Sequence, residues 1–216
     1  MQRFLGIFLL LGCVSLAASE TRLAIDGKAA VSVMHAQDAS EHVRSAASDL
    51  AGVLGRMTGA AFSIESGGEA RGIIVGTVAQ FPDVPGAGKL DASDPLRREE
   101  YLIRTDGGRV WLIGATDAGA SHAVWEFLHG FGYRQYFPGP DWEIVPAKAN
   151  LSADLDVFAS PSYKTRVFAW HFGNWPELNA ETQAWEIRNR VPPPGMFPEI
   201  FRLNTSHTYG AVINQY

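Results

Sequence analysis

The histidines are the first side chains in this sequence that could do chemistry. The six of them are His35, His42, His122, His129, His171 and His207. A metal site needs histidines or acids at a ligand spacing, and none of the six has that spacing with support from nearby acids. His122 and His129 are seven residues apart and would share one side of a helix, where a surface pair is the favoured interpretation. We therefore expect no metal and no cofactor.

Three motifs that carry common chemistry are absent from the sequence. No GxxxxGK(S/T) or GxGxxG loop follows an expected strand, so Gly72 and Gly76 only bracket an apolar segment and hold no phosphate. There is no HExxH motif of a zinc hydrolase and no GxSxG motif of a serine hydrolase. These three classes of protein have no support.

Aromatic side chains gather in one region of the chain. Ten aromatic residues lie between Tyr133 and Trp175, out of 12 Phe, 6 Tyr and 6 Trp in the whole sequence. One interpretation is packing in a core or between domains. The other is a sugar-binding surface, because pyranose rings stack their C–H faces on flat aromatic rings while polar groups hold the hydroxyls. The aromatic residues alone leave both interpretations open.

The elements that must position these side chains follow an α/β pattern. Apolar residues at helical spacing predict one helix that begins at Ser40 and is closed by Gly59. A second helix is capped by Thr116 or Asp117 and ends at Gly130. The expected strands cover residues 23–25, 30–34, 62–64 and 72–76, a long loop covers 78–98, and a β-hairpin joins 101–105 to 109–113. The prediction for residues 20–158 is a two-layer α/β domain, an α+β sandwich with two main helices on one mixed sheet.

Composition and charge limit the class of protein further. The 216 residues are 46% hydrophobic and 19% charged, which is typical of a globular protein and leaves room for one domain or one and a half. The net charge is −5, from 18 Lys and Arg against 23 Asp and Glu. Because such a surface repels phosphate backbones, we exclude nucleic acid as a partner.

Residues 1–19 are predicted to be a secretory signal peptide. Arg3 precedes an apolar run over residues 4–16, and small residues follow it. The run is too short for a membrane-spanning helix with proper flanks. Residues 10–13 (LLGC) also resemble a lipoprotein motif, which would place a lipid anchor on Cys13 as the only membrane contact. The protein is thus expected to be secreted or periplasmic, and ordinary cleavage would remove its single cysteine.

The order of several short segments resembles a known family. They are residues 71–77 (RGIIVGT), 100–104 (EYLIR), 113–115 with Gly119, 123–128 (AVWEFL), 132–134 (GYR), 136–139 (YFPG) and 142–146 (WEIVP). Together they resemble the N-terminal domain of α-glucuronidases of glycoside hydrolase family 67, which is shared with domain 2 of family 20 hexosaminidases. The sequence is also similar to domain-of-unknown-function family 4838, exported bacterial proteins in which such a domain precedes a predicted (β/α)8 barrel. The resemblance covers about residues 28–216 and implies a carbohydrate-active protein.

The resemblance also implies where a substrate would bind. Residues 160–163 would be a linker and residues 164–170 the first barrel strand, with active-site residues at its C-terminal end. Residues 171–175 (HFGNW) are similar to a His-Trp-Asp-Asn cluster of family 67, in a different order. Residues 185–190 would belong to the first barrel helix, and residues 204–209 would open the next strand and loop. The implied substrate-binding residues are Trp170, His171, Asn174, Trp175, Arg188 and His207.

Residues 159–216 are too few for a barrel. They number 58, whereas a (β/α)8 barrel takes about 200 or more. We therefore expect a truncated chain that holds only the start of a barrel. Glycoside hydrolysis needs two carboxyl groups across the scissile bond, and that pair would lie on later strands, which leaves the catalytic residues unknown and this chain inactive.

The acids that are present have other expected roles. Glu126 is expected to be solvated or to lie between domains, and Asp141 and Glu143 to shape a turn or meet Arg134. Among the acids after Trp175, only Glu177 could approach a substrate.

Two hypotheses about function remain. In the first, the chain is the N-terminal part of an exported glycoside hydrolase, similar to an α-glucuronidase, that acts on a polysaccharide or an oligosaccharide. In the alternative, it is a carbohydrate-binding or accessory domain without hydrolysis of its own.

Overall fold

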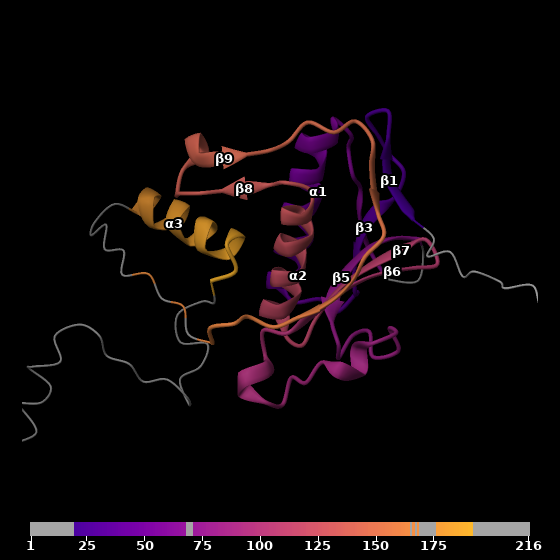
Figure 1. The fold of residues 1–216 in the computed structure, drawn as a ribbon, viewed down its shortest axis with the longest axis vertical. Coiled ribbons are helices and arrows are strands. Elements are labelled where there is room, and N and C mark those ends of the chain that lie inside the picture. The colour runs from indigo at the N-terminus through magenta and orange to yellow at the C-terminus, as the bar shows by residue number, and fades with distance from the viewer. Residues whose placement is uncertain (1–19, 68–70, 165, 167, 169–175, 192–216) are drawn as a thin grey trace, which may run out of the picture.

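A computed structural model of the chain describes residues 20–67, 71–164, 166, 168 and 176–191, and its centre is a six-stranded mixed sheet (Figure 1). The strand order is β11-β6-β7-β5-β3-β4. In chain order the strands are β3 (Ser32–His35), β4 (Ile64–Ser66), β5 (Gly72–Thr77), β6 (Tyr101–Asp106), β7 (Arg109–Gly114) and β11 (Asp156–Ala159). β4, β3, β5 and β7 run parallel to one another, whereas β6 is antiparallel to both of its neighbours, β7 and β11. The predicted mixed α/β class is confirmed.

Helix α1 (Glu41–Thr58) follows the sequence pattern closely. The hydroxyl of Ser40 accepts a hydrogen bond from the backbone N–H of Val43 at 3.2 Å, as an N-cap residue does. At the other end Gly59 has φ +79°, and its N–H donates to the carbonyl oxygen of Gly55 at 2.8 Å. Both predicted ends of this helix are confirmed.

Helix α2 (Asp117–Gly130) begins very close to the sheet. A Cβ on Gly114, at the end of β7, would lie 1.9 Å from the backbone nitrogen of Ala120. A Cβ on Gly119 would lie 2.4 Å from the carbonyl oxygen of Glu100, just before β6. Only glycine leaves room for this approach. The contact brings the first turn of α2 against the carboxyl end of β7, where the candidate site described below begins.

The two faces of the sheet are covered differently. Both helices lie on one face, and the strands send Val33, Ile73 and Val75 toward them. On the other face, side chains such as Ile74 and Trp111 are covered by the long segment over residues 78–98. That segment contains two short 3₁₀ helices, Ala87–Lys89 and Pro95–Arg97. The predicted loop therefore forms a second cover for the sheet, and β5 is buried throughout, as expected.

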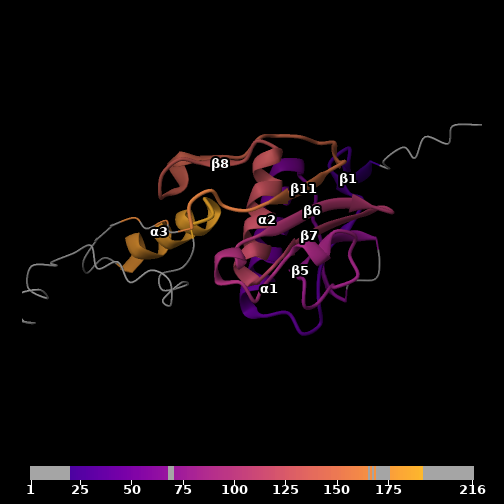
Figure 2. The same ribbon diagram turned by 60° about the horizontal axis from the view of Figure 1, so that its bottom comes forward.

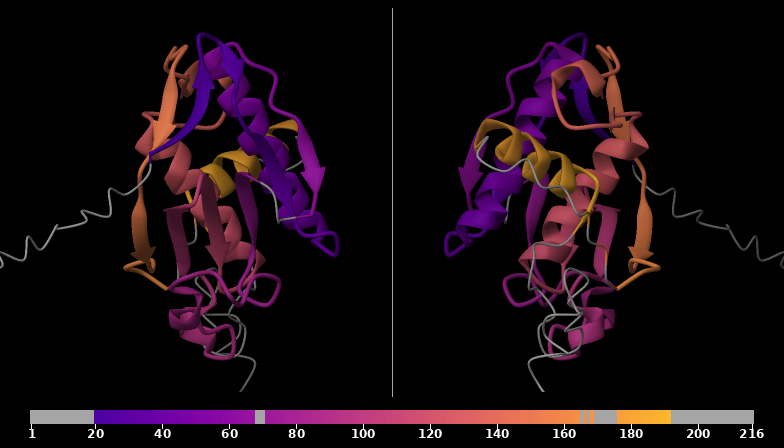
Figure 3. Two further views of the ribbon diagram at one scale, coloured as in Figure 1. Left: turned by 90° about the vertical axis from the view of Figure 1, so that its right-hand side faces the viewer. Right: turned by 90° about the vertical axis from the view of Figure 1, so that its left-hand side faces the viewer.

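Smaller elements surround this core. β1 (Thr21–Ile25) pairs with β2 (Lys28–Ala29) and β10 (Leu151–Ala153), and β8 (Arg134–Gln135) pairs with β9 (Glu143–Ile144) through a connection that holds a 3₁₀ turn, Pro140–Trp142. β11 lies at the edge of the main sheet, beside β6 (Figure 2). Helix α3 (Pro176–Arg188) packs on α2, outside the α1 and α2 layer and away from the sheet (Figures 1 and 3). α3 thus adds a partial third layer to the expected two.

One expected strand is displaced along the chain. The strand expected at residues 62–64 is β4, Ile64–Ser66, because its position is set by parallel pairing with β3, in which Val33 is opposite Ile64. The barrel strand expected at residues 164–170 lies mostly outside the described residues, which in that range are Lys164, Arg166 and Phe168, so it stays a prediction.

Candidate functional site

Two groups of polar contacts join the α/β domain to the chain that follows Ala159. The Glu99 group consists of Glu99, His122, Arg166, Arg190 and Glu126. The Gln135 group consists of Gln135, Glu143, Trp185, Arg188 and Asn189. In both groups, side chains or carbonyl groups of the α/β domain bind residues that come after the sheet in the sequence. We refer to the two groups together as the junction.

Glu99 is the buried centre of the first group. Its residue is 1% exposed, and its carboxylate accepts a hydrogen bond from His122 Nε2 at 2.7 Å. The guanidinium of Arg166 donates to both carboxylate oxygens, with 3.3 Å from Nη1 to Oε2. A buried carboxylate is tolerated only when it is paired in this way. Arg166 is thereby fixed to the α/β domain.

His122 is held in its neutral form. It is 3% exposed, and burial lowers the pKa of its imidazole, an effect that the Glu99 carboxylate only partly offsets. In the neutral ring that donates from Nε2 to Glu99, Nδ1 carries a lone pair. No described residue offers a hydrogen bond to this buried Nδ1. His122 therefore has one acceptor to spare.

Arg190 ends helix α3 and closes the Glu99 group. Its φ is +61°, in the left-handed region where glycine is usual. The N–H of Arg190 donates to Ile187 O at 3.0 Å and that of Val191 to Glu186 O at 2.9 Å, the two bonds of a Schellman motif. The Arg190 carbonyl oxygen accepts bonds of 3.1 and 2.8 Å from Arg166. Its guanidinium contacts Glu126, which therefore lies between the domain and the following segment, one of the two places expected for it.

The Gln135 group binds α3 to β8. Gln135 is 4% exposed, and its backbone oxygen accepts hydrogen bonds from Trp185 Nε1 at 3.1 Å and Asn189 Nδ2 at 3.0 Å. Its side-chain oxygen accepts a bond of 2.8 Å from Arg188. The same guanidinium lies over the ring of Trp125, 5.9 Å from its centroid. Residue 135 thus positions the last turns of α3.

Glu143 extends this group to α1. Arg56 donates to its carboxylate at 2.8 Å from Nη2, and the hydroxyl of Tyr133 donates at 2.7 Å. The hydrogen bond from Arg56 is the main cause that lowers the pKa of Glu143 to about 2. Burial, followed by the contact with Glu143, raises the pKa of Tyr133. The carboxylate is charged and tightly held, which suits a structural role.

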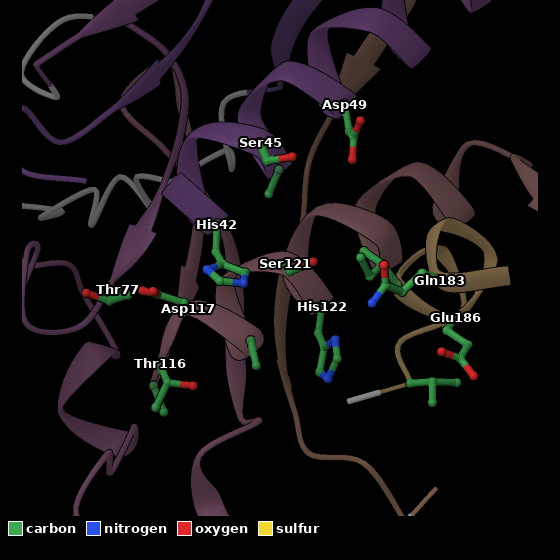
Figure 4. Close-up of a pocket in the computed structure, with 15 residues that line it drawn as sticks. His42, Ser45, Asp49, Thr77, Thr116, Asp117, Ser121, His122, Gln183 and Glu186 are labelled. Atoms are coloured by element: carbon green, nitrogen blue, oxygen red, sulfur yellow. The ribbon is translucent and has the colours of Figure 1, made fainter. Parts of the chain in front are cut away.

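A pocket of about 740 Å³ lies between α1, α2 and α3, next to the junction (Figure 4). Figure 4 shows polar side chains of all three helices around this space. They are His42, Ser45 and Asp49 of α1, Asp117, Ser121 and His122 of α2, and Gln183 and Glu186 of α3. Thr77, at the end of β5, and Ala115, just after β7, close the pocket toward the sheet. Ligands of α/β proteins commonly bind beyond the carboxyl ends of parallel strands.

The pocket presents carboxyl groups and lacks a fixed cation in its wall. No lysine or arginine is among the described residues that line it. Burial raises the pKa of Asp49 and of Glu186. In the described part of the chain, no group of three or more His, Cys, Asp or Glu side chains is placed to hold a metal ion. The pocket can bind a ligand through hydrogen bonds.

Most of the substrate-binding residues expected from the sequence cannot be located. Trp170, His171, Asn174, Trp175 and His207 lie outside the described residues. Arg188 is described, and its guanidinium contacts Gln135 and Trp125 within the junction. Glu177 is an exposed residue of the first turn of α3.

Two expectations about polar residues are wrong. His122 and His129 are not a surface pair, because His122 is buried against Glu99, and the ring of His129 stacks on Tyr133 with centroids 6.0 Å apart. Burial is the main cause that lowers the pKa of His129 to about 4. Glu143 does not contact Arg134, which donates instead to the carbonyl oxygens of His129 and Tyr133. His122 is buried by its contact with Glu99, which is distant in the sequence, and Arg134 binds backbone carbonyl groups in place of Glu143.

The described aromatic residues divide between the two interpretations offered for them. Tyr133 is fully buried and packs on Trp125, which is core packing. Tyr136 and Trp142 are 65% and 55% exposed on the β8 and β9 hairpin. The exposed rings are available to a partner, and no described contact decides whether that partner is a sugar.

Sequence reasoning missed the residues that form the junction. Glu99, Gln135, Arg166 and Arg190 were not singled out, because each is bound by a partner at least 24 residues away. The one available indication was a charge in an apolar context. Arg166 directly precedes the apolar run over residues 167–170, and a charge beside such a run indicates a partner.

The comparison with protein families identifies this domain. Residues 17–127 match the family model described as the N-terminus of glycosyl hydrolase family 67, which covers just over half of the 216 residues. The chain belongs to this family. The expected resemblance to family 67 is confirmed. Gly114 and Gly119, which make the close contact between β7 and α2, lie within the matched residues. No curated protein sequence matches this family member significantly.

Solved structures share the fold at low sequence identity. One is a GH115 4-O-methyl-α-glucuronidase, BtGH115A, with specificity for decorated arabinogalactans, at a TM-score of 0.60 and 16% identity over 79% of this chain. The GH20 β-N-acetylhexosaminidase of Streptomyces coelicolor A3(2) matches 68% of this chain at 18% identity and a TM-score of 0.42. A GH20 exo-β-N-acetylglucosaminidase of Vibrio harveyi matches 68% at 15% identity and a TM-score of 0.40. The matches cover 25%, 26% and 18% of those chains, so this family 67 N-terminal domain spans about a quarter or less of their length.

Proposed function

We propose that the chain is the N-terminal part of an exported glycoside hydrolase, similar to an α-glucuronidase, that acts on a polysaccharide or oligosaccharide. Membership of the family 67 N-terminal family supports this proposal, as does the fold shared with a GH115 α-glucuronidase. The role proposed for the α/β domain is to position the segment that would open the catalytic barrel.

The junction carries this proposal. Arg166 is fixed by Glu99, and α3 is fixed by Gln135. In the sequence, residues 169–175 lie between these two attachments, and they include Trp170, His171, Asn174 and Trp175, the residues that the family resemblance assigns to a substrate pocket. Buried, paired charges restrict geometry more than apolar contacts of the same size do. A rigid domain attached at both ends of a binding segment would hold it in one position.

The test compares the present chain with a longer product of the same gene, where the reading frame continues past Tyr216. We expect the longer protein to release uronic acid from glucuronoxylan or arabinogalactan, or to cleave a p-nitrophenyl glycoside, and the 216-residue chain to do neither. Glycosidase activity of the 216-residue chain that is lost in Glu177→Gln would contradict the proposed placement of the catalytic acids. A longer protein with no activity on any of these substrates would contradict hydrolysis and favour the accessory alternative.

Domain limits and export belong to the same proposal. We propose that residues 1–19 are a signal peptide, with lipidation of Cys13 as the alternative, and that residues 20–158 are the α/β domain. Mass spectrometry of the exported protein would distinguish a new N-terminus near residue 20 from a lipidated Cys13. A chain ending after Ala159, where β11 ends, should unfold cooperatively. First proteolytic cuts within residues 40–130 would contradict that limit. No helix in the described part is long and apolar enough to cross a membrane.

A further inference from the structure

The pocket between α1, α2 and α3 is not explained by the contacts of the junction. We propose that it is a binding site for an uncharged sugar, formed by the α/β domain together with α3. This inference rests on the carbohydrate function proposed above and adds a ligand to a part of the protein for which only a positioning role has been argued.

The size and walls of the pocket suit a sugar. Its volume of about 740 Å³ falls within the range of about 300–1,000 Å³ usual for small-molecule sites. Apolar side chains form part of the wall, among them Ala46, Ala118, Ile187 and Val191. A pyranose presents C–H faces that can pack against such a wall and hydroxyls that need polar partners. The combination of apolar surface and several polar groups is typical of small-molecule sites.

The pocket combines several hydrogen-bond acceptors with hydroxyl groups that can also donate, those of Ser45, Thr77, Thr116 and Ser121. Asp49 on α1 and Glu186 on α3 bring carboxyl groups from different helices, and Gln183 adds an amide. His122, from α2, is more than nine-tenths buried, and its Nδ1 has no hydrogen-bond partner among the described residues. A buried acceptor without a partner costs free energy. A ligand rich in hydroxyl donors would satisfy these acceptors.

The charge of the pocket argues against an anionic ligand, and the cost of desolvation argues against a cationic one. An anion such as a uronate would meet carboxyl groups and no lining lysine or arginine. Arg188 and Arg56 lower the pKa of Asp49 from outside the lining, but burial acts more strongly and raises it. An ammonium ion would lose its hydration against the apolar wall, which costs more than the transfer of a hydroxyl. An uncharged polyhydroxyl ligand avoids both penalties.

The location of His122 connects the pocket to the junction. The same ring lines the pocket and donates to Glu99, which holds Arg166. A ligand in the pocket would therefore contact the side chain that supports the Glu99 group.

The first experiment measures binding to the 216-residue chain by calorimetry. The uncharged probes are cellobiose, xylobiose and galactobiose, the anionic probe is glucuronic acid, and the cationic probe is spermidine. We expect at least one disaccharide to bind at least about tenfold more tightly than glucuronic acid and spermidine, a difference of about 1.4 kcal/mol. Tighter binding of either charged probe would overturn the proposal, as would the absence of binding by all three disaccharides to the folded chain.

The second experiment uses matched pairs of variants. Ser45→Leu places a larger side chain in the pocket from α1, and Ser48→Leu, at an exposed site of the same helix outside the lining, is its control. Glu186→Gln changes a lining acceptor on α3, and Glu177→Gln changes an exposed acid of that helix. We expect at least about a tenfold loss of disaccharide affinity in Ser45→Leu, a smaller loss in Glu186→Gln, and no change in the controls.

These outcomes separate the pocket from the proposed hydrolase function. Equal disaccharide binding by Ser45→Leu and Ser48→Leu, both folded by circular dichroism, would place the ligand elsewhere and overturn the site. Glu186→Gln adds no bulk, so it keeps the test decisive if Ser45→Leu fails to fold. A pocket that binds sugar in a longer protein without glycosidase activity would refute hydrolysis alone. Activity in the longer protein with no disaccharide binding by this chain would refute the pocket alone.

Discussion

The apolar core under α1 and α2 and the junction around Glu99 and Gln135 are stabilised in different ways. The core is a layer of aliphatic and aromatic side chains, and its closest contact, at Gly114 and Gly119, is between backbones. The junction contains a few buried polar side chains, each hydrogen-bonded to a partner on another element. Apolar packing does not depend on pH, and it is destabilised by substitutions that leave a cavity or add bulk. A buried ion pair is destabilised when one partner is removed or when its carboxylate is protonated.

The largest effect is expected in the core, from Gly114→Ala. Its Cβ would lie 1.9 Å from the backbone nitrogen of Ala120 and 2.3 Å from the carbonyl carbon of Gly119, and backbone cannot move aside as a side chain can. We expect a loss of about 4 kcal/mol or more in the free energy of unfolding, measured by urea denaturation. The control is Gly52→Ala in α1, where a Cβ meets nothing within 4 Å. It should stabilise the chain by about 0.5–1 kcal/mol.

The next largest effect is expected in the junction, from Glu99→Gln. The substitution leaves Arg166 without its buried counter-charge, which should reduce the free energy of unfolding by about 3–5 kcal/mol. Limited proteolysis should then cut first within residues 160–191. The matched control is Asp156→Asn, which removes an exposed pair with Arg104 at 3.8 Å and should cost at most about 0.5 kcal/mol. Equal losses in the two variants would remove the distinction between junction and surface.

The pH dependence should also differ between the two regions. The folded chain lowers the pKa of Glu143 from 4.5 to about 2, because Arg56 donates to its carboxylate. The stability that this group contributes is therefore present above pH 4.5 and is lost as the pH falls toward 2. We expect unfolding free energies measured between pH 5 and 3 to fall more steeply in the wild-type chain than in Glu143→Gln. Parallel curves would show that the Arg56 contact does not persist in solution.

The buried histidines act in a separate pH window. Folding lowers the pKa of His129 from 6.5 to about 4. As the pH falls through this interval, the unfolded chain binds a proton before the folded chain does, so the free energy of unfolding decreases. The pKa of His122 is lowered as well, with the same sign. The wild-type chain and Glu143→Gln both keep these histidines, so the histidine contribution is common to the two stability curves.

The smallest effect is expected at the end of α3, from Arg190. Its φ of +61° is strained for any residue with a Cβ, whereas glycine adopts it freely. Its pair with Glu126 is about one-third exposed and adds little. We expect Arg190→Gly to be more stable than Arg190→Ala by about 1 kcal/mol in thermal unfolding. A more stable alanine variant would argue against the Schellman geometry.

The elements with local patterns were predicted well. Ser40 and Gly59 mark the ends of α1, and the hairpin of β6 and β7 follows from alternating residues around two glycines. β4 was misplaced by two residues, since its position depends on pairing with β3. The predicted barrel strand included Arg166, and its binding to Glu99, 67 positions away, has no local pattern in the sequence.

The candidate site was predicted less well than the fold, because its contacts join residues that are distant in the sequence. Arg188 was predicted as a site residue from family resemblance, and its contacts with Gln135 and Trp125 could not be read from spacing. His122 was expected on the surface because only its own helix was considered, whereas Glu99 and α3 cover it. The pocket has walls from three helices, and no single segment carries its pattern.

By itself, the sequence determined the α/β class, both main helices, the caps of α1, the hairpin and the family of this domain. These features depend on propensity, periodicity and turn residues that lie within about twenty positions of one another. Only the tertiary structure decided which charges are buried together and which helices enclose a pocket. Such pairs form between residues such as Glu99 and Arg166, 67 positions apart, where burial and the loss of water make the partner necessary.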